Sequence, residues 1–184
     1  MATTLTGKET PVRSAVRQIL RLHELSIAGK GNSAEATATC DALEVPWDAM
    51  TRPEQERVGG LSEDLYALQD GGAKQVEMTP AERQRWAEEA KTAFAAYARG
   101  DSDTALAFLR RSSPRGLPRH IVPFLQARCW EQMGEAQVAL LFMREAERFD
   151  PSQAVSVFTL LQQVGPPDEV ERYADRILNG AQSS

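Results

Sequence analysis

The chain has 184 residues, 42% hydrophobic and 26% charged, a balance that is ordinary for a globular protein and argues against bulk disorder. Its 21 basic and 26 acidic residues give a formal net charge of -5, so the strongly basic balance typical of nucleic-acid binding is excluded. No apolar run is long enough to span a membrane, and the N-terminus has no export signal. We therefore expect a cytoplasmic protein with no nucleic-acid or membrane partner.

The two cysteines, Cys40 and Cys129, lie far apart in the sequence and do not have the spacing of a zinc site or a disulfide framework. Both fall among apolar neighbours in predicted helices. We expect two small buried thiols. The sequence predicts no metal and no cofactor.

Residues 1–9 are small and polar, and we expect a disordered N-terminus there. Residues 10–72 are predicted to form an N-terminal helical cassette. Its first helix begins at Thr10 and Pro11, an N-cap followed by proline at the first helical position, and ends near Gly29. Its predicted buried stripe comprises Val12, Val16, Ile19, Leu20, His23 and Ile27.

Three further short helices are expected in the cassette. Asn32 is predicted to cap a helix over 33–43, with Glu35 reaching back to it, and the segment 45–47, which contains Pro46, is predicted to break that helix. A helical turn from 51 is predicted to stop at Gly59 and Gly60. Ser62 is predicted to cap the last helix, and the glycine-rich segment 70–73 marks a boundary or hinge.

Helices are predicted in pairs over 78–182. Thr79, Pro80 and Glu82 form a capping-box pattern that opens a helix to Arg99, and residues 104–111 form its partner. A second pair is predicted over 119–133 and 136–149. A shorter third pair is predicted over 152–164 and 167–178.

A fixed sequence interval relates the first two pairs. Gly134 follows Gly100 by the same interval that separates Ala139 from Ala105. Gly165 follows Gly134 by a slightly shorter interval, so the third unit is shortened. A shared period of about 34 residues indicates stacked helix pairs.

This pattern resembles the tetratricopeptide repeat family, whose unit is a helix-turn-helix of about 34 residues. The matching positions are Ala127, Trp130, Gly134, Ala139, Met143, Ala146 and Pro151. The first repeat departs from the pattern, with Ala96 in place of the usual aromatic residue and Ser112 in place of the second alanine. The resemblance implies an all-α fold, a short right-handed α-solenoid with repeats at about 79–117, 118–151 and 152–180. The cassette, over roughly 19–68, also resembles a leader segment ahead of such repeats in uncharacterised bacterial proteins.

In this family the first helices of successive pairs line a concave groove that binds a peptide or a partner helix. The resemblance therefore implies a non-catalytic adaptor or scaffold for a protein or peptide partner. The groove positions carried over to this chain are Lys91, Phe94, Tyr97, Phe124, Arg128, Glu131, Gln132, Thr159 and Gln162. An alternative is a structural or self-associating module, in which Phe94 and Tyr97 pack against the cassette and fill the groove.

Two other groups of residues could carry a function. Arg110, Arg111, Arg115, Arg119 and His120 concentrate positive charge between the first two repeats, and we interpret them as a solvated loop. His23 beside Glu24 suggests a second alternative, an enzyme subunit that uses polar groups of the cassette. Because nothing places a proton-transfer group within reach of a substrate there, we expect a histidine on a helix face and no enzymatic activity.

Overall fold

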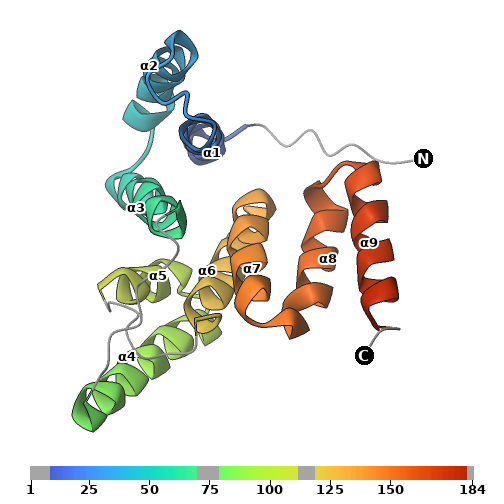
Figure 1. Cartoon of the computed structure of the whole chain (residues 1–184). Helices are drawn as coiled ribbons and strands as arrows, with labels where there is room; N and C mark the ends of the chain where they lie inside the picture. Colours follow the sequence, from blue (N-terminus) through green and yellow to red (C-terminus); the bar gives the residue numbers. More distant parts are fainter. Residues whose placement is uncertain (1–8, 70–78, 112–118, 182–184) are drawn as a thin grey trace. The chain divides into compact units, whose positions relative to one another are not determined.

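The computed structural model describes residues 9–69, 79–111 and 119–181 (Figure 1). Throughout these ranges the regular structure is helical, without a strand, and this confirms the all-α prediction. None of the helices in these ranges is long and apolar enough to cross a membrane. The predicted hinge at 70–73 and nearly all of the predicted disordered N-terminus lie outside the described residues. The chain divides into two compact units, Met1–Asp70 and Gly71–Ser184, and each is described by itself.

Unit 1 contains α1 (Pro11–Ile27), α2 (Ala34–Asp48) and α3 (Arg52–Gln69), and α1 packs against both of the others. Thr10 caps α1 as predicted, because its side chain accepts a hydrogen bond from the Arg13 amide at 3.3 Å. The predicted burial of Ile27 is wrong: its exposed fraction is 67%, and Leu25 is buried instead. The core combines α1 residues with α3 residues spaced three and four apart: Val12, Val16, Ile19, Val58, Leu61 and Leu65.

The turn from α1 to α2 differs from the prediction in its cap. Ser33, not Asn32, is the N-cap, and its hydroxyl accepts a hydrogen bond from the Ala36 amide at 3.2 Å. Glu35 is therefore not needed for a capping box and instead pairs with Arg21 of α1.

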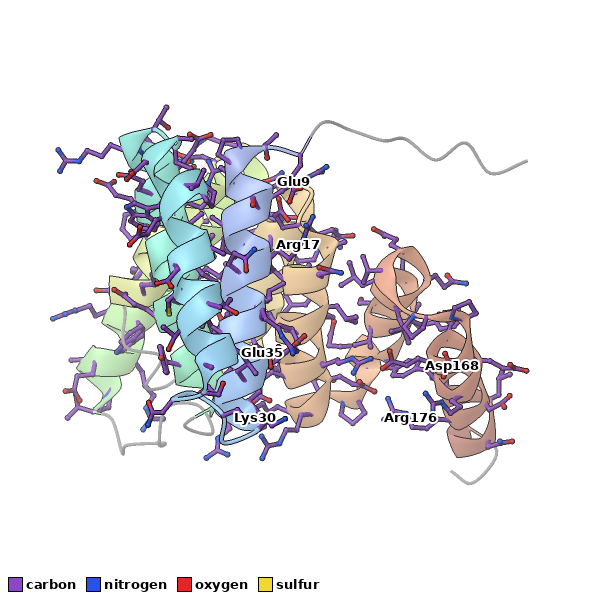
Figure 2. The ribbon with its side chains drawn as sticks, turned by 90° about the horizontal axis from the view of Figure 1, so that it is seen from above. Glu9, Arg17, Lys30, Glu35, Asp168 and Arg176 are labelled. Carbon is purple, nitrogen blue, oxygen red and sulfur yellow. The ribbon has the colours of Figure 1, made fainter. Side chains whose placement is uncertain are left out.

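Exposed ion pairs decorate the surface of unit 1. Glu9 pairs with Arg17 at 2.8 Å, and Glu35 pairs with Arg21. Figure 2 shows Glu9 and Arg17 toward one end of α1 and Glu35 toward the other. Because both partners of each pair stay in contact with solvent, these pairs add little to the free energy of unfolding.

The prediction that both thiols are buried holds for Cys129 and is wrong for Cys40, which is exposed on α2. The α2 surface that packs inward carries Ala36 and Thr39 instead. Thr39 tolerates this position because its hydroxyl donates to the Glu35 carbonyl at 2.7 Å, which satisfies the polar group within the helix.

Helix α2 continues through Pro46, so the predicted break at 45–47 is wrong. Proline removes one backbone donor, yet the Ala49 amide still bonds the Val45 carbonyl at 3.3 Å. Pro46 itself is buried, and the Trp47 carbonyl accepts a hydrogen bond from the Gln55 side chain of α3 at 2.9 Å. The packing of this last turn within unit 1 offsets the free-energy cost of proline inside the helix.

The predicted stop at Gly59 and Gly60 is also wrong, because α3 runs unbroken from Arg52 to Gln69. Ser62, expected as an N-cap, lies in the middle of that helix. Val58, Leu61 and Leu65 around the glycines are at most 2% exposed. Their burial stabilises a helix that glycine weakens by about 1 kcal/mol per residue.

Gly59→Ala should raise the free energy of unfolding by about 0.5–1 kcal/mol, because alanine is the better residue in a helix interior. A Cβ at this position would lie 3.7 Å from Cη2 of Trp47, which is an ordinary van der Waals contact. Urea denaturation followed by circular dichroism measures the change. A loss of stability would show that α3 is not helical at Gly59.

Unit 2 consists of α4 (Pro80–Ala98), α5 (Ser102–Arg111), α6 (Ile121–Gln132), α7 (Ala136–Phe149), the short 3-10 helix η1 (Pro151–Gln153), α8 (Ala154–Val164) and α9 (Pro167–Ala181). Each α-helix packs against the next one in the chain, most extensively α6 on α7 and α4 on α5. Gly100 and Gly134 both have a φ of 83°, so the two glycine turns share one left-handed conformation. The helices therefore pack pairwise.

The core of unit 2 combines small and large side chains. Trp130, Phe142 and Met143 are fully buried. Small residues allow helices to approach closely, and the large ones fill the space beside them. The small residues are alanines that are at most 1% exposed: Ala93, Ala96, Ala105, Ala127, Ala139 and Ala146.

Candidate functional site

On α6 the predicted partner-binding residues lie on the more accessible side of the helix. Phe124, Arg128 and Glu131 are spaced four and three residues apart, so they form one row along the helix, and all three are half-buried. Cys129 and Trp130, on the other side of α6, are at 0% exposure, and the buried Ala127 lies between Phe124 and Glu131 along the helix. The row therefore keeps part of its surface accessible beside the core.

Helix α4 shows a comparable row. Lys91 is exposed, the exposed fraction of Phe94 is 37%, and Tyr97 is half-buried. Ala93 and Ala96 face the interior. An aromatic ring that remains this accessible on a packed helix provides apolar contact area for a partner.

Helix α8 carries a third row. Thr159 and Gln162 are exposed, and Val155, four residues before Thr159, has an exposed fraction of 68%. The Thr159 hydroxyl donates to the Val155 carbonyl at 2.9 Å, which leaves the hydroxyl oxygen able to accept. This row is uncharged.

The three rows occupy equivalent repeat positions. The interval between the two glycine turns also relates Phe94 to Arg128, and the shorter interval of the third unit relates Arg128 to Thr159. We call the nine predicted residues on α4, α6 and α8 the row face. Because each helix packs mainly against its neighbours in the chain, α5 and α7 come between the rows in the packing order. A continuous groove joining the rows stays a prediction.

Both cations of the row face already have a carboxylate partner on their own helix. The Lys91 ammonium lies 2.7 Å from a Glu88 oxygen, and Arg128 pairs with Glu131 one turn away. Such pairs on a helix surface stabilise by a few tenths of a kcal/mol. Because these pairs are weak, a carboxylate from a partner could share the cation with Glu88 or Glu131, or displace them.

Gln132 has a second role within unit 2. Its side-chain oxygen accepts a hydrogen bond from the Ser102 hydroxyl at the start of α5, where Ser102 is 4% exposed. The bond joins residues far apart in the sequence and ties α6 to α5. Nothing local in the sequence predicts it.

The positive cluster between the first two repeats is partly engaged. The Arg119 guanidinium lies 5.4 Å from the centre of the Phe149 ring, and Nε2 of His120 lies 3.8 Å from an Asp150 oxygen. Arg115 and the side chain of Arg111 lie outside the described residues. Arg119 and His120 thus contact residues at the C-terminal end of α7.

Four arginines line an open groove of about 680 Å³ in the terminal part of unit 2. Two ion pairs bridge α7 and α9: Arg144 with Glu169 at 2.6 Å and Arg176 with Glu147 at 2.9 Å. Figure 2 places Asp168 and Arg176 on α9. Asp168 pairs with Arg172 on the same helix. On α7, Arg148 pairs with Glu145. With every arginine balanced by an acid, the groove is a structural ion-pair network. Tyr173 lies in the wall of this groove. Burial is the main cause, and the Glu147 carboxylate the second, that raises the pKa of Tyr173 to about 12.

His23 and Leu20, predicted to belong to the buried stripe of α1, are only half-buried there. Burial lowers the pKa of the His23 imidazole, and the nearby Glu24 carboxylate opposes this effect. His23 also lines a small pocket in unit 1, which the sequence did not indicate. Among the described residues, no group of three or more His, Cys, Asp or Glu side chains could hold a metal ion.

Comparison with protein-family models, curated proteins and solved structures finds no match to this chain. The resemblance to tetratricopeptide repeats therefore rests on the residues that suggested it. The structure adds the left-handed turns at Gly100 and Gly134 and the pairwise packing of the helices, and membership of the family stays a prediction.

Proposed function

We propose that this protein is a non-catalytic adaptor that binds an extended segment of a partner protein along the row face. The observation that carries the proposal is the repetition of partly or fully accessible side chains at equivalent positions of α4, α6 and α8. Stacked helix pairs characteristically present such repeated positions to a ligand. A right-handed solenoid with a continuous groove is part of the proposal.

The chemistry of the rows defines the segment. Phe94 and Tyr97 offer aromatic surface for an apolar anchor. The row face has two cations, Lys91 and Arg128, and an acidic group of a peptide could share each of them with the carboxylate that it already pairs with. The α8 row can bond a peptide backbone through its hydroxyl and amide groups. The preferred ligand is therefore an extended peptide with one large apolar residue and at least one Asp or Glu.

Selection from a peptide display library on the intact chain tests this proposal. Peptides enriched on the wild-type protein should contain the apolar and acidic residues described above. Phe94→Ser and Arg128→Ala should each weaken their binding by about tenfold or more, as fluorescence anisotropy measures it, because contacts at an interface centre contribute at least ~1.4 kcal/mol each.

Two matched controls separate binding from stability. Leu178→Ser removes an exposed apolar side chain, with an exposed fraction of 63%, from α9 outside the row face. Arg172→Ala removes an exposed arginine that pairs with Asp168 on the same helix. Both controls should bind like the wild type. Equal binding by all four variants, or no enriched peptide, would contradict the proposal.

The self-associating alternative gives a different result. A concentration-dependent dimer in light scattering, weakened by Phe94→Ser and not by Leu178→Ser, would show that the row face contacts a second copy. In that case enriched peptides should be absent or should compete with dimer formation. The same set of variants therefore distinguishes peptide binding from self-association.

A further inference from the structure

The three helices of unit 1 line a partly open pocket of about 280 Å³. This volume lies just below the range of about 300–1,000 Å³ that is usual for small-molecule sites. The pocket therefore suits a small ligand. Its wall takes His23 and Ser26 from α1, Trp47 from α2, and Gly59, Ser62 and Tyr66 from α3, and the remaining lining residues are leucines and an isoleucine.

The wall is apolar with a few hydrogen-bonding groups. Ser26, Ser62 and Tyr66 supply hydroxyls, and His23 supplies an imidazole whose burial lowers its pKa and favours the neutral form. Among the described residues that line the pocket there is no Lys, Arg, Asp or Glu. An ionic ligand would lose its hydration without gaining an opposite charge, so the lining selects neutral compounds.

Gly59 helps to keep this pocket open. A glycine inside a helix is less favourable than alanine. Here an added Cβ would meet its nearest neighbour, Trp47 Cη2, at 3.7 Å, so packing does not require glycine. What glycine provides is space beside the indole ring.

We propose that the unit 1 pocket binds a neutral compound with a single ring and one hydrogen-bonding substituent, roughly eight to ten non-hydrogen atoms in size. The ring lies against Trp47 and the leucine side chains, because aromatic and apolar surfaces favour a flat apolar ligand. Its polar substituent bonds the His23 imidazole. This site is independent of the row face and of the adaptor function.

Titration of the intact chain with p-cresol, a small neutral phenol, tests the site by amide NMR shifts. We expect saturable binding with a Kd on the order of 1 mM, which corresponds to about 4 kcal/mol and is reasonable for so small a ligand. The largest shifts should fall on Gly59, Ser62 and residues near His23. The charged probes 4-methylbenzoate and 4-methylbenzylamine should bind at least about tenfold more weakly.

Variants locate the binding and guard against misfolding. Gly59→Leu should abolish p-cresol binding by filling the space beside Trp47, whereas Ala42→Leu, which introduces the same side chain at an exposed position of α2, should not change it. Should Gly59→Leu fail to fold, Ser62→Val narrows the same wall with a smaller change.

His23→Phe should remove the preference for p-cresol over p-xylene, which lacks the hydroxyl. Three results would each overturn the proposal: absence of saturable p-cresol binding, equal binding by the charged probes, and unchanged binding by the folded filling variants.

Discussion

Trp130→Ala should lower the free energy of unfolding by about 3–5 kcal/mol, the largest loss we expect from a single substitution in this chain. The indole of Trp130 is fully buried, so the truncation removes apolar contact and leaves a cavity in unit 2. Because small domains have about 5–15 kcal/mol of stability in total, the variant should unfold at a much lower urea concentration. Urea titration monitored by circular dichroism measures the shift.

Trp130→Phe is the informative control. Within the described part of the chain, Nε1 of Trp130 is buried and has no hydrogen-bond partner. A buried donor without an acceptor costs about 1–3 kcal/mol, and phenylalanine removes that donor while keeping a ring in place. Its loss of stability should therefore be well below that of Trp130→Ala. Equal losses would mean that the indole nitrogen is satisfied, and no loss for either would contradict the packing of α6.

Gly165→Ala should destabilise unit 2 by about 1–2 kcal/mol, because the overpacking it causes outweighs the usual benefit of alanine. Gly165 ends α8 in an extended conformation, with φ -83° and ψ 155°, which any residue adopts. The obstacle is steric: an added Cβ would lie 2.6 Å from Cδ1 and 2.8 Å from the carbonyl oxygen of Leu161. Leu161 is fully buried and its oxygen accepts the Gly165 amide at 2.7 Å, so neither atom moves freely.

Two effects of opposite sign decide that outcome. Restricting the unfolded chain favours alanine by about 0.4–1 kcal/mol, whereas overpacking costs about 1–3 kcal/mol, so the steric effect dominates. Gly59→Ala is the matched control, since its added Cβ makes an ordinary contact. The same substitution should thus give opposite signs at the two positions in urea denaturation. A gain of stability at Gly165 would show that α8 ends differently.

Local capping and turn signals predicted much of unit 2. The Thr79 capping box forms in full, with the Thr79 hydroxyl accepting from the Glu82 amide at 3.3 Å and the Glu82 carboxylate accepting from the Thr79 amide at 2.8 Å. The predicted range 136–149 matches α7, because a glycine turn precedes that helix and Asp150 caps the 3-10 helix after it. These signals depend on neighbouring residues alone, so a sequence suffices to find them.

Unit 1 was harder to predict, because tertiary packing overrides its local signals. Pro46 and Gly59 normally interrupt helices, yet here contacts between α2 and α3 through Trp47 sustain both. The pocket escaped prediction for the same reason, since three helices must meet before its wall exists. For the row face, the repeat period predicted equivalent positions, but not the bond from Ser102 that engages Gln132.

Because the two cysteines are unequally buried, the native chain can be labelled selectively at one of them. Cys40 is exposed on α2, whereas Cys129 is fully enclosed in α6. A maleimide fluorophore would therefore attach at one defined point of unit 1 without mutagenesis. The Cys129 thiol would react when α6 separates from its neighbours, so its labelling rate reports how often unit 2 opens. Cys40 thus provides a labelling site, and Cys129 provides a probe of local unfolding.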